Sequence, residues 1–70
     1  MTETEAIQLF KCLADKSRLQ ILKSLAIEDM YVERLAERLG LSAPTISFHL
    51  KKLSDAGAVS AYKNQYYMMY

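Results

Sequence analysis

Apolar residues recur every three or four positions along most of the chain, which is the spacing of amphipathic helices. Thr2 and Asp15 precede apolar runs, where their side chains can act as N-caps, and Gly40 and Gly57 follow such runs as C-terminal stops. Glu5 comes three positions after Thr2, the spacing of a capping box. The pattern predicts helices over residues 3–13, 16–26, 31–39 and 43–56. The residues expected to face inward from the first three are Ala6, Leu9, Phe10, Leu13, Leu19, Ile21, Leu22, Leu25, Ala26, Val32, Leu35, Ala36 and Leu39.

The fourth predicted helix has two unlike faces. Its apolar side repeats at positions i, i+4 and i+7, as Ile46, Leu50 and Leu53. Ser42 can cap this helix, and Pro44 lies in its first turn, where no backbone N–H is needed. The opposite side carries Thr45, Ser47, Phe48, Lys51 and Lys52. An apolar back and a front of hydroxyls, one aromatic ring and two lysines are typical of the helix that a helix-turn-helix inserts into a DNA major groove.

After Gly57 the hydrophobic period changes from 3.6 to 2. Residues 58–62 and 66–70 alternate as strands do, and residues 63–65 can join them. A hairpin that follows a helix-turn-helix is a wing. The predicted fold is therefore mainly α, a winged helix-turn-helix of four helices and a two-stranded β-hairpin, in one DNA-binding domain over residues 1–70.

Composition narrows the class of protein further. The chain has 70 residues and one cysteine, so it can form no intramolecular disulfide. No run approaches the ~18 apolar residues of a membrane span, and the acidic N-terminus is unlike a signal peptide, so we expect a cytoplasmic protein. The net charge is only +1, but residues 41–70 hold three lysines against Asp55 alone. The basic surplus thus lies on the predicted reading helix and the wing.

Four segments, taken together, resemble the ArsR/SmtB-type winged helix-turn-helix repressors. Residues 10–22 read F-K-C-L-A-D-K-S-R-L-Q-I-L, close to the family's opening F-K-A-L-A-D-P-T-R-L-R-I-L. Residues 35–42 (L-A-E-R-L-G-L-S), 44–53 (P-T-I-S-F-H-L-K-K-L) and 56–59 (A-G-A-V) resemble its third helix and turn, its reading helix and its entry to the wing. The resemblance implies a homodimer that binds a two-fold-symmetric operator and releases it when an effector binds.

The sequence departs from the family pattern in two places. Metal sensors of the family often carry Cys-Val-Cys at the start of the third helix, where this chain reads Tyr31-Val32-Glu33. We therefore expect no metal site there and no cofactor. Many members also continue past the wing into a helix that supplies dimer contacts. We expect the natural chain to continue beyond Tyr70 into such an effector or dimerisation segment.

The candidate DNA-binding residues lie on the fourth helix and the wing. Hydroxyls can donate to or accept from base edges, and an exposed phenylalanine or an alanine methyl can pack on thymine. Lysines can neutralise phosphates. Ordinary alternatives stand beside these roles: helix capping for Ser42 and Thr45, burial against another chain for Phe48, and solvation for the lysines. The candidates are Ser42, Ala43, Thr45, Ser47, Phe48, Lys51, Lys52 and Lys63.

Three other residues invite a chemical role. His49 is the only histidine, and one histidine with one cysteine cannot complete a zinc shell, so we expect it to be partly buried and hydrogen-bonded to backbone. Cys12 lies near an apolar helix face and is expected to act as a small hydrophobe. Arg18 fits either a salt bridge with Asp15 or a DNA contact.

The chain contains no catalytic constellation that sequence can identify. It lacks a Gly-rich phosphate loop, a nucleophile with a histidine base, and paired carboxylates in an apolar setting. We therefore predict that the protein binds double-stranded DNA sequence-specifically, as a dimer, to repress transcription. We do not expect it to be an enzyme. The alternative is a winged-helix module used for protein–protein assembly, whose affinity for random duplex would depend little on salt.

Overall fold

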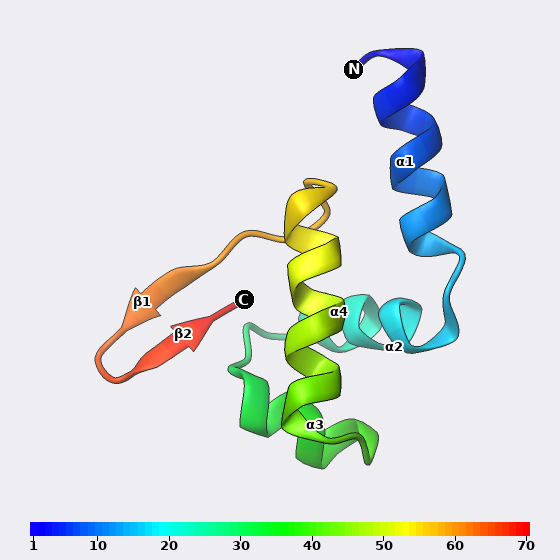
Figure 1. The fold of residues 1–70 in the computed structure, drawn as a ribbon. Coiled ribbons are helices and arrows are strands. Elements are labelled where there is room, and N and C mark those ends of the chain that lie inside the picture. Colours follow the sequence, from blue (N-terminus) through cyan, green and yellow to red (C-terminus); the bar gives the residue numbers. More distant parts are fainter.

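The structure is a computed structural model that describes all of residues 1–70. It contains four helices followed by an antiparallel hairpin (Figure 1), which confirms the predicted winged helix-turn-helix. No helix has both the length and the apolar character needed to cross a membrane. Each helix ends within one residue of its predicted limits. The elements are α1 (Glu3–Leu13), α2 (Lys16–Leu25), α3 (Val32–Leu39), α4 (Ala43–Asp55), β1 (Tyr62–Asn64) and β2 (Tyr67–Met69).

Side-chain caps start the first two helices where the sequence places them. Thr2 Oγ1 accepts the backbone N–H of Glu5 at 3.1 Å, and the Glu5 carboxylate accepts the N–H of Thr2 at 3.4 Å. Asp15 Oδ1 accepts the backbone N–H of Arg18 at 3.0 Å. That bond is the main cause that holds the pKa of Asp15 below its ordinary 3.8. Both caps satisfy N–H groups that a helix start leaves without partners.

A small apolar core lies where the four helices meet. Its members come from all four helices and from the segment before α3. Three of them form the back of α4, which makes that helix the centre of the fold. The buried apolar residues are Cys12, Ile21, Met30, Leu35, Ile46, Leu50 and Leu53.

Three residues predicted to face inward are exposed instead. Phe10 on α1 is 68% exposed, Leu19 on α2 is 47% exposed, and Ala26, which follows α2, is also exposed. Figure 1 shows α1 extending past the rest of the helical body. No element of this chain covers Phe10 or Leu19 enough to bury its side chain.

The wing is shorter than predicted. Its strands pair only over three residues each, with Lys63 opposite Met68, so Lys63 lies inside β1 and not in the connection. Ala58 and Val59 were expected in the first strand, but they are half-buried against the helical core, which keeps residues 58–61 out of the hairpin. The tight turn falls at Gln65, whose φ is 57°, and Tyr66.

Three contacts tie the wing to the segment before α3. Met30 and Tyr70 exchange two backbone hydrogen bonds, at 2.9 and 3.2 Å. The Tyr31 and Tyr67 rings stack with centroids 4.3 Å apart. The Tyr62 hydroxyl donates to the Asp29 carboxylate at 2.6 Å, which raises the pKa of Tyr62 above 10.0. The wing is therefore attached at its base while its tip stands clear of the helices.

Candidate nucleic-acid interface

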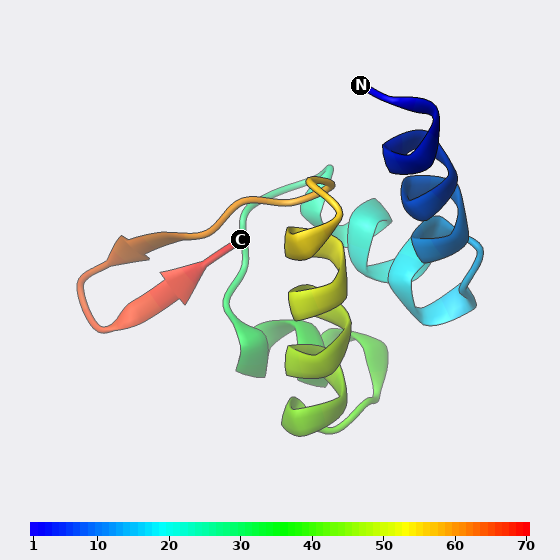
Figure 2. The same cartoon turned by 45° about the horizontal axis from the view of Figure 1, so that its top comes forward.

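The turn between α3 and α4 sets the angle of the fourth helix. Gly40 ends α3 in the left-handed conformation, with φ 68°, which costs glycine little and most other residues considerably more. The next N–H, that of Leu41, donates to the carbonyl of Ala36 at 3.1 Å. Figure 2 shows the hairpin leaving the helical body on the side opposite α1.

The first turn of α4 uses two of the candidate hydroxyls for its own structure. Ser42 Oγ accepts the backbone N–H of Thr45 at 3.3 Å and donates to Thr45 Oγ1 at 2.8 Å. Pro44 lies in the first turn of the helix, as predicted. The capping role expected of Ser42 is confirmed, while contact of either hydroxyl with DNA stays a prediction.

The front of α4 is open to solvent while its back is sealed. Ile46, Leu50 and Leu53 are at most 1% exposed. On the other side Ser47 is exposed and Phe48 is 55% exposed, so more than half of the Phe48 side chain is open to solvent within this chain. The candidates at the start of the helix, Ala43 and Thr45, are half-buried.

The three lysines of the site differ in whether a carboxylate lies close enough to pair with the ammonium group. Lys51 lies 3.5 Å from the Asp55 carboxylate one turn further on. Lys52 places its ammonium 5.5 Å from the centre of the Phe48 ring, a cation–π distance. Lys63 is exposed on β1 and has no ion-pair partner. Lys52 and Lys63 are therefore the two lysines of this site that form no ion pair with a carboxylate.

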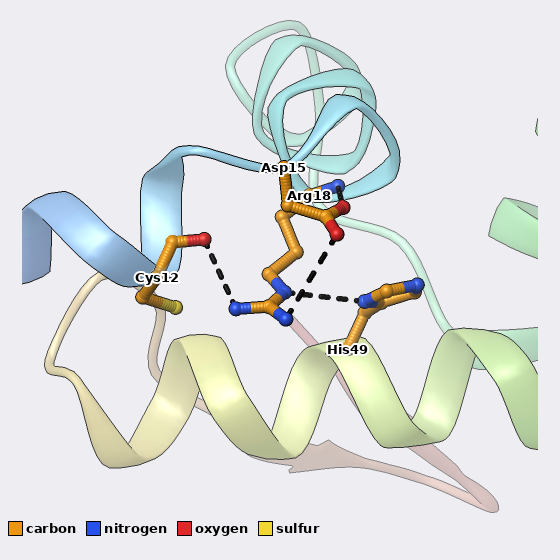
Figure 3. A network of polar contacts seen from close by, with 4 residues as sticks. All are labelled: Cys12, Asp15, Arg18 and His49. Carbon is orange, nitrogen blue, oxygen red and sulfur yellow. Dashed lines mark hydrogen bonds and ion pairs between the residues drawn. The ribbon is translucent and has the colours of Figure 1, made fainter.

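A polar network links the junction between α1 and α2 to α4 (Figure 3). Arg18 Nε donates to His49 Nδ1 at 3.2 Å, and Arg18 Nη1 donates to the carbonyl oxygen of Cys12 at 3.1 Å. Arg18 Nη2 lies 3.9 Å from Asp15 Oδ2, which confirms the predicted salt bridge. The prediction that His49 bonds to backbone is wrong, because its Nδ1 accepts from the Arg18 side chain instead. His49 is half-buried, as expected. The Arg18 side chain is 17% exposed and each of its three guanidinium nitrogens has a partner within the chain, which supports the salt bridge over a DNA contact.

The remaining candidate for chemistry is Cys12, a free thiol that is 8% exposed within the core. This placement fits the small hydrophobe that the sequence predicts. No group of three or more histidine, cysteine, aspartate or glutamate side chains is arranged to hold a metal ion.

Sequence reasoning did not identify two contacts that shape the interface. The Arg18–His49 bond joins residues 31 positions apart, and the stacked Tyr31 and Tyr67 join the wing to the start of α3. Periodicity carries no signal for either pairing. The only hint was a lone polar histidine at the edge of an apolar helix stripe.

Comparisons with known proteins agree with this geometry. Residues 15–61 match the model of a family described as bacterial regulatory protein, arsR family. The chain is 47% identical over 53 residues to the HTH-type transcriptional regulator KmtR of Mycobacterium tuberculosis, covering 76% of this chain and 41% of that protein. It is 37% identical over 70 residues to an arsenical resistance operon repressor of Staphylococcus xylosus, covering all of this chain and 67% of the repressor.

A solved structure supports the same conclusion about the fold. The solution structure of a homodimeric winged helix-turn-helix DNA-binding domain from Mycobacterium bovis superimposes with a TM-score of 0.92 at 33% identity. The match covers 96% of this chain and 62% of that one. The fold and the sequence therefore point to the same group of proteins.

Proposed function

The chain belongs to the arsR family of bacterial regulatory proteins, and we propose that it binds one DNA operator as a homodimer and represses transcription there. In this proposal the front of α4 enters the major groove, and lysines of α4 and the wing contact phosphates. The proposal assigns no catalytic residue. Binding to a chromosome also requires the cytoplasmic location that the sequence predicts.

The observation that carries the proposal is the contrast between the two faces of α4. A helix whose back is fully buried and whose front presents Ser47 and Phe48 is held rigidly with its polar and aromatic side chains outward. Side chains on a rigid element keep the geometry that base-edge contacts need. Ala43, which presents a methyl group, can add contact with thymine near the helix start.

The lysines supply the component of binding that does not depend on sequence. Lys52 and Lys63 have no carboxylate partner, so each can neutralise a phosphate and release a counterion. Lys51 shares its charge with Asp55 and should contribute less. Ser42 and Thr45 keep the capping bond with each other and can still accept or donate at the phosphate backbone.

A dimer explains how so small a domain could recognise a specific site. One protomer offers a single reading helix, whereas two related by a two-fold axis place paired helices about 34–36 Å apart on a palindromic duplex. Ile7 and Phe10 on α1, which are 47% and 68% exposed, leave apolar surface that a second protomer can cover. The homodimeric relative from M. bovis and the S. xylosus protein named as a repressor support this proposal.

The effector is a separate question from the operator. KmtR and the S. xylosus repressor are longer than this chain, and a dimerisation or effector segment beyond Tyr70 stays a prediction. The start of α3 offers Tyr31 and Glu33 where similar metal sensors have thiolates, so the proposal places no metal there.

Selection from a pool of random duplexes tests the proposal. The chain should enrich a palindromic sequence whose half-sites lie about 10 base pairs apart, and two chains should bind each duplex. Affinity for random duplex should fall steeply with salt. Failure to enrich any sequence, with an affinity that salt barely changes, would instead favour the protein–protein assembly module.

A further inference from the structure

Arg18 connects three elements of the fold through one side chain. It starts on α2, donates to the carbonyl that ends the buried part of α1 at Cys12, and donates to His49 on α4. Figure 3 shows the guanidinium lying between Cys12 at the end of α1 and His49 on α4. No other side chain of α4 makes a hydrogen bond or an ion pair with another helix.

This single polar contact differs in kind from the rest of the packing of α4. The back of α4 is held by apolar burial, which is strong but carries little directional preference. A hydrogen bond prefers a narrow range of distance and angle. His49 follows Phe48 of the exposed front and precedes Leu50 of the buried back, so the bond acts at the edge of the reading face. Arg18 is therefore placed to fix the rotation of α4 about its axis.

The chemistry of the bond requires a neutral histidine. A guanidinium has only N–H donors and keeps its proton at any ordinary pH. His49 Nδ1 must therefore offer a lone pair, and the ring proton resides on Nε2. A proton added to Nδ1 removes the acceptor and places a second positive charge 3.2 Å from Arg18 Nε.

We propose that Arg18 is a positioning residue for the reading helix, and that protonation of His49 releases this restraint and weakens recognition of the operator. The proposal rests on the DNA-binding function proposed above. It makes specific binding depend on pH through the charge of the His49 ring.

The Asp15 carboxylate on α2 attracts a protonated His49. Its two oxygens already face the backbone N–H and the guanidinium of Arg18, so it does not replace the lost bond. On α1, the Cys12 carbonyl already accepts from Arg18, and Lys11 lines the same pocket as Arg18 and Lys52. Lys52 lies one turn further along α4 and adds positive charge. No charged side chain of α3 bonds to His49.

A competing effect sets the choice of readout. A protonated His49 adds positive charge beside the DNA, which would strengthen binding to every duplex. Loss of the restraint weakens only binding that depends on the geometry of α4. The ratio of operator affinity to random-duplex affinity separates the two effects, since the added charge cancels from it.

The first experiment measures this ratio for the duplex selected at about pH 7.5, at that pH and at about pH 5.5. For the wild type we expect the ratio to fall on the order of tenfold at the lower pH, the scale of one hydrogen bond to a charged group. In His49→Asn, Oδ1 takes the place of Nδ1 as an acceptor that does not titrate, so the ratio should change little between the two pH values, whatever its size. His49→Gln, whose acceptor lies one bond further out, is the matched control and should start with a low ratio.

A wild-type ratio that is equal at both pH values would overturn the proposal. So would an His49→Asn protein whose ratio falls with pH as the wild type's does, since titration would then act elsewhere. Arg18→Ala should give a low ratio at both pH values. If that variant fails to fold, the comparison of His49→Asn with His49→Gln still decides the outcome.

A second experiment does not depend on an operator. Because His49 is the only histidine, its ring nitrogens give the only imidazole signals in a ¹⁵N spectrum. At about pH 7.5 we expect the tautomer with the proton on Nε2. A proton on Nδ1 would contradict the proposal even if DNA binding is confirmed. If the expected tautomer is found but no operator can be selected, the Arg18–His49 hydrogen bond stands and the DNA-binding function is refuted instead.

Discussion

Replacing Lys63 by alanine tests whether the wing contacts the DNA backbone. Lys63 lies in β1, opposite Met68, with its side chain exposed and without a carboxylate partner. Its removal breaks no ion pair and opens no cavity, so the fold should be unaffected. Any change in DNA binding can then be assigned to the lost charge.

The expected magnitude follows from counterion release. Each phosphate contact that is lost flattens the slope of log affinity against log salt by roughly 0.9, and a dimer loses two, so by about 1.8. Between about 50 and 200 mM salt the wild type should therefore lose about 12-fold more affinity than Lys63→Ala. Because Lys51 is 3.5 Å from Asp55, Lys51→Ala should change the slope by less.

Fluorescence anisotropy of a labelled duplex across a salt series measures both slopes. Lys23→Ala is the matched control, because Lys23 is an exposed lysine of α2 that the proposal does not assign to DNA. Lys63→Ala should weaken binding to operator and random duplex by similar factors, since phosphates carry no sequence information. An unchanged slope would remove the wing from the interface.

Three further predictions concern stability and metals. Leu50→Ala, at a site 1% exposed, should lower the free energy of unfolding by about 2–5 kcal/mol in chemical denaturation, and Leu19→Ala, at a 47% exposed site, by much less; equal losses would contradict the assigned core. The lowered pKa of Asp15 contributes stability above pH 3.8 that is lost as pH falls through the folded value, so Asp15→Asn should have a flatter acid unfolding profile than the wild type, and an identical profile would refute this. Zinc or cadmium should leave DNA bound, because Tyr31 and Glu33 offer no thiolate; tight one-to-one metal binding that releases DNA would contradict this.

The helices could be predicted because their signals are local. Asp15 and Ser42 cap helices through bonds to N–H groups three residues away. Gly40 ends α3 through its own left-handed backbone conformation. The i, i+4, i+7 spacing of the α4 back likewise depends only on the helical period. Such features need no knowledge of the rest of the fold.

The errors lie where distant parts of the chain meet. Periodicity marks Phe10 as apolar but cannot tell whether another element covers it, and within this chain none does. The alternation after Gly57 predicts strands, yet the packing of Val59 against the helices shortens the first one. The partner of His49 was missed for the same reason, since Arg18 lies 31 residues earlier.

The central claim, that the front of α4 reads bases, is tested most directly by replacing Ser47 and Phe48 together with alanine. Both side chains are exposed, so the double variant should fold as the wild type does. Its affinity for the selected operator and for random duplex should be measured in the same salt. The account predicts a loss for the operator that is at least tenfold larger than the loss for random duplex, on the order of one base contact per protomer. Equal losses on the two duplexes would show that this helix does not read the sequence.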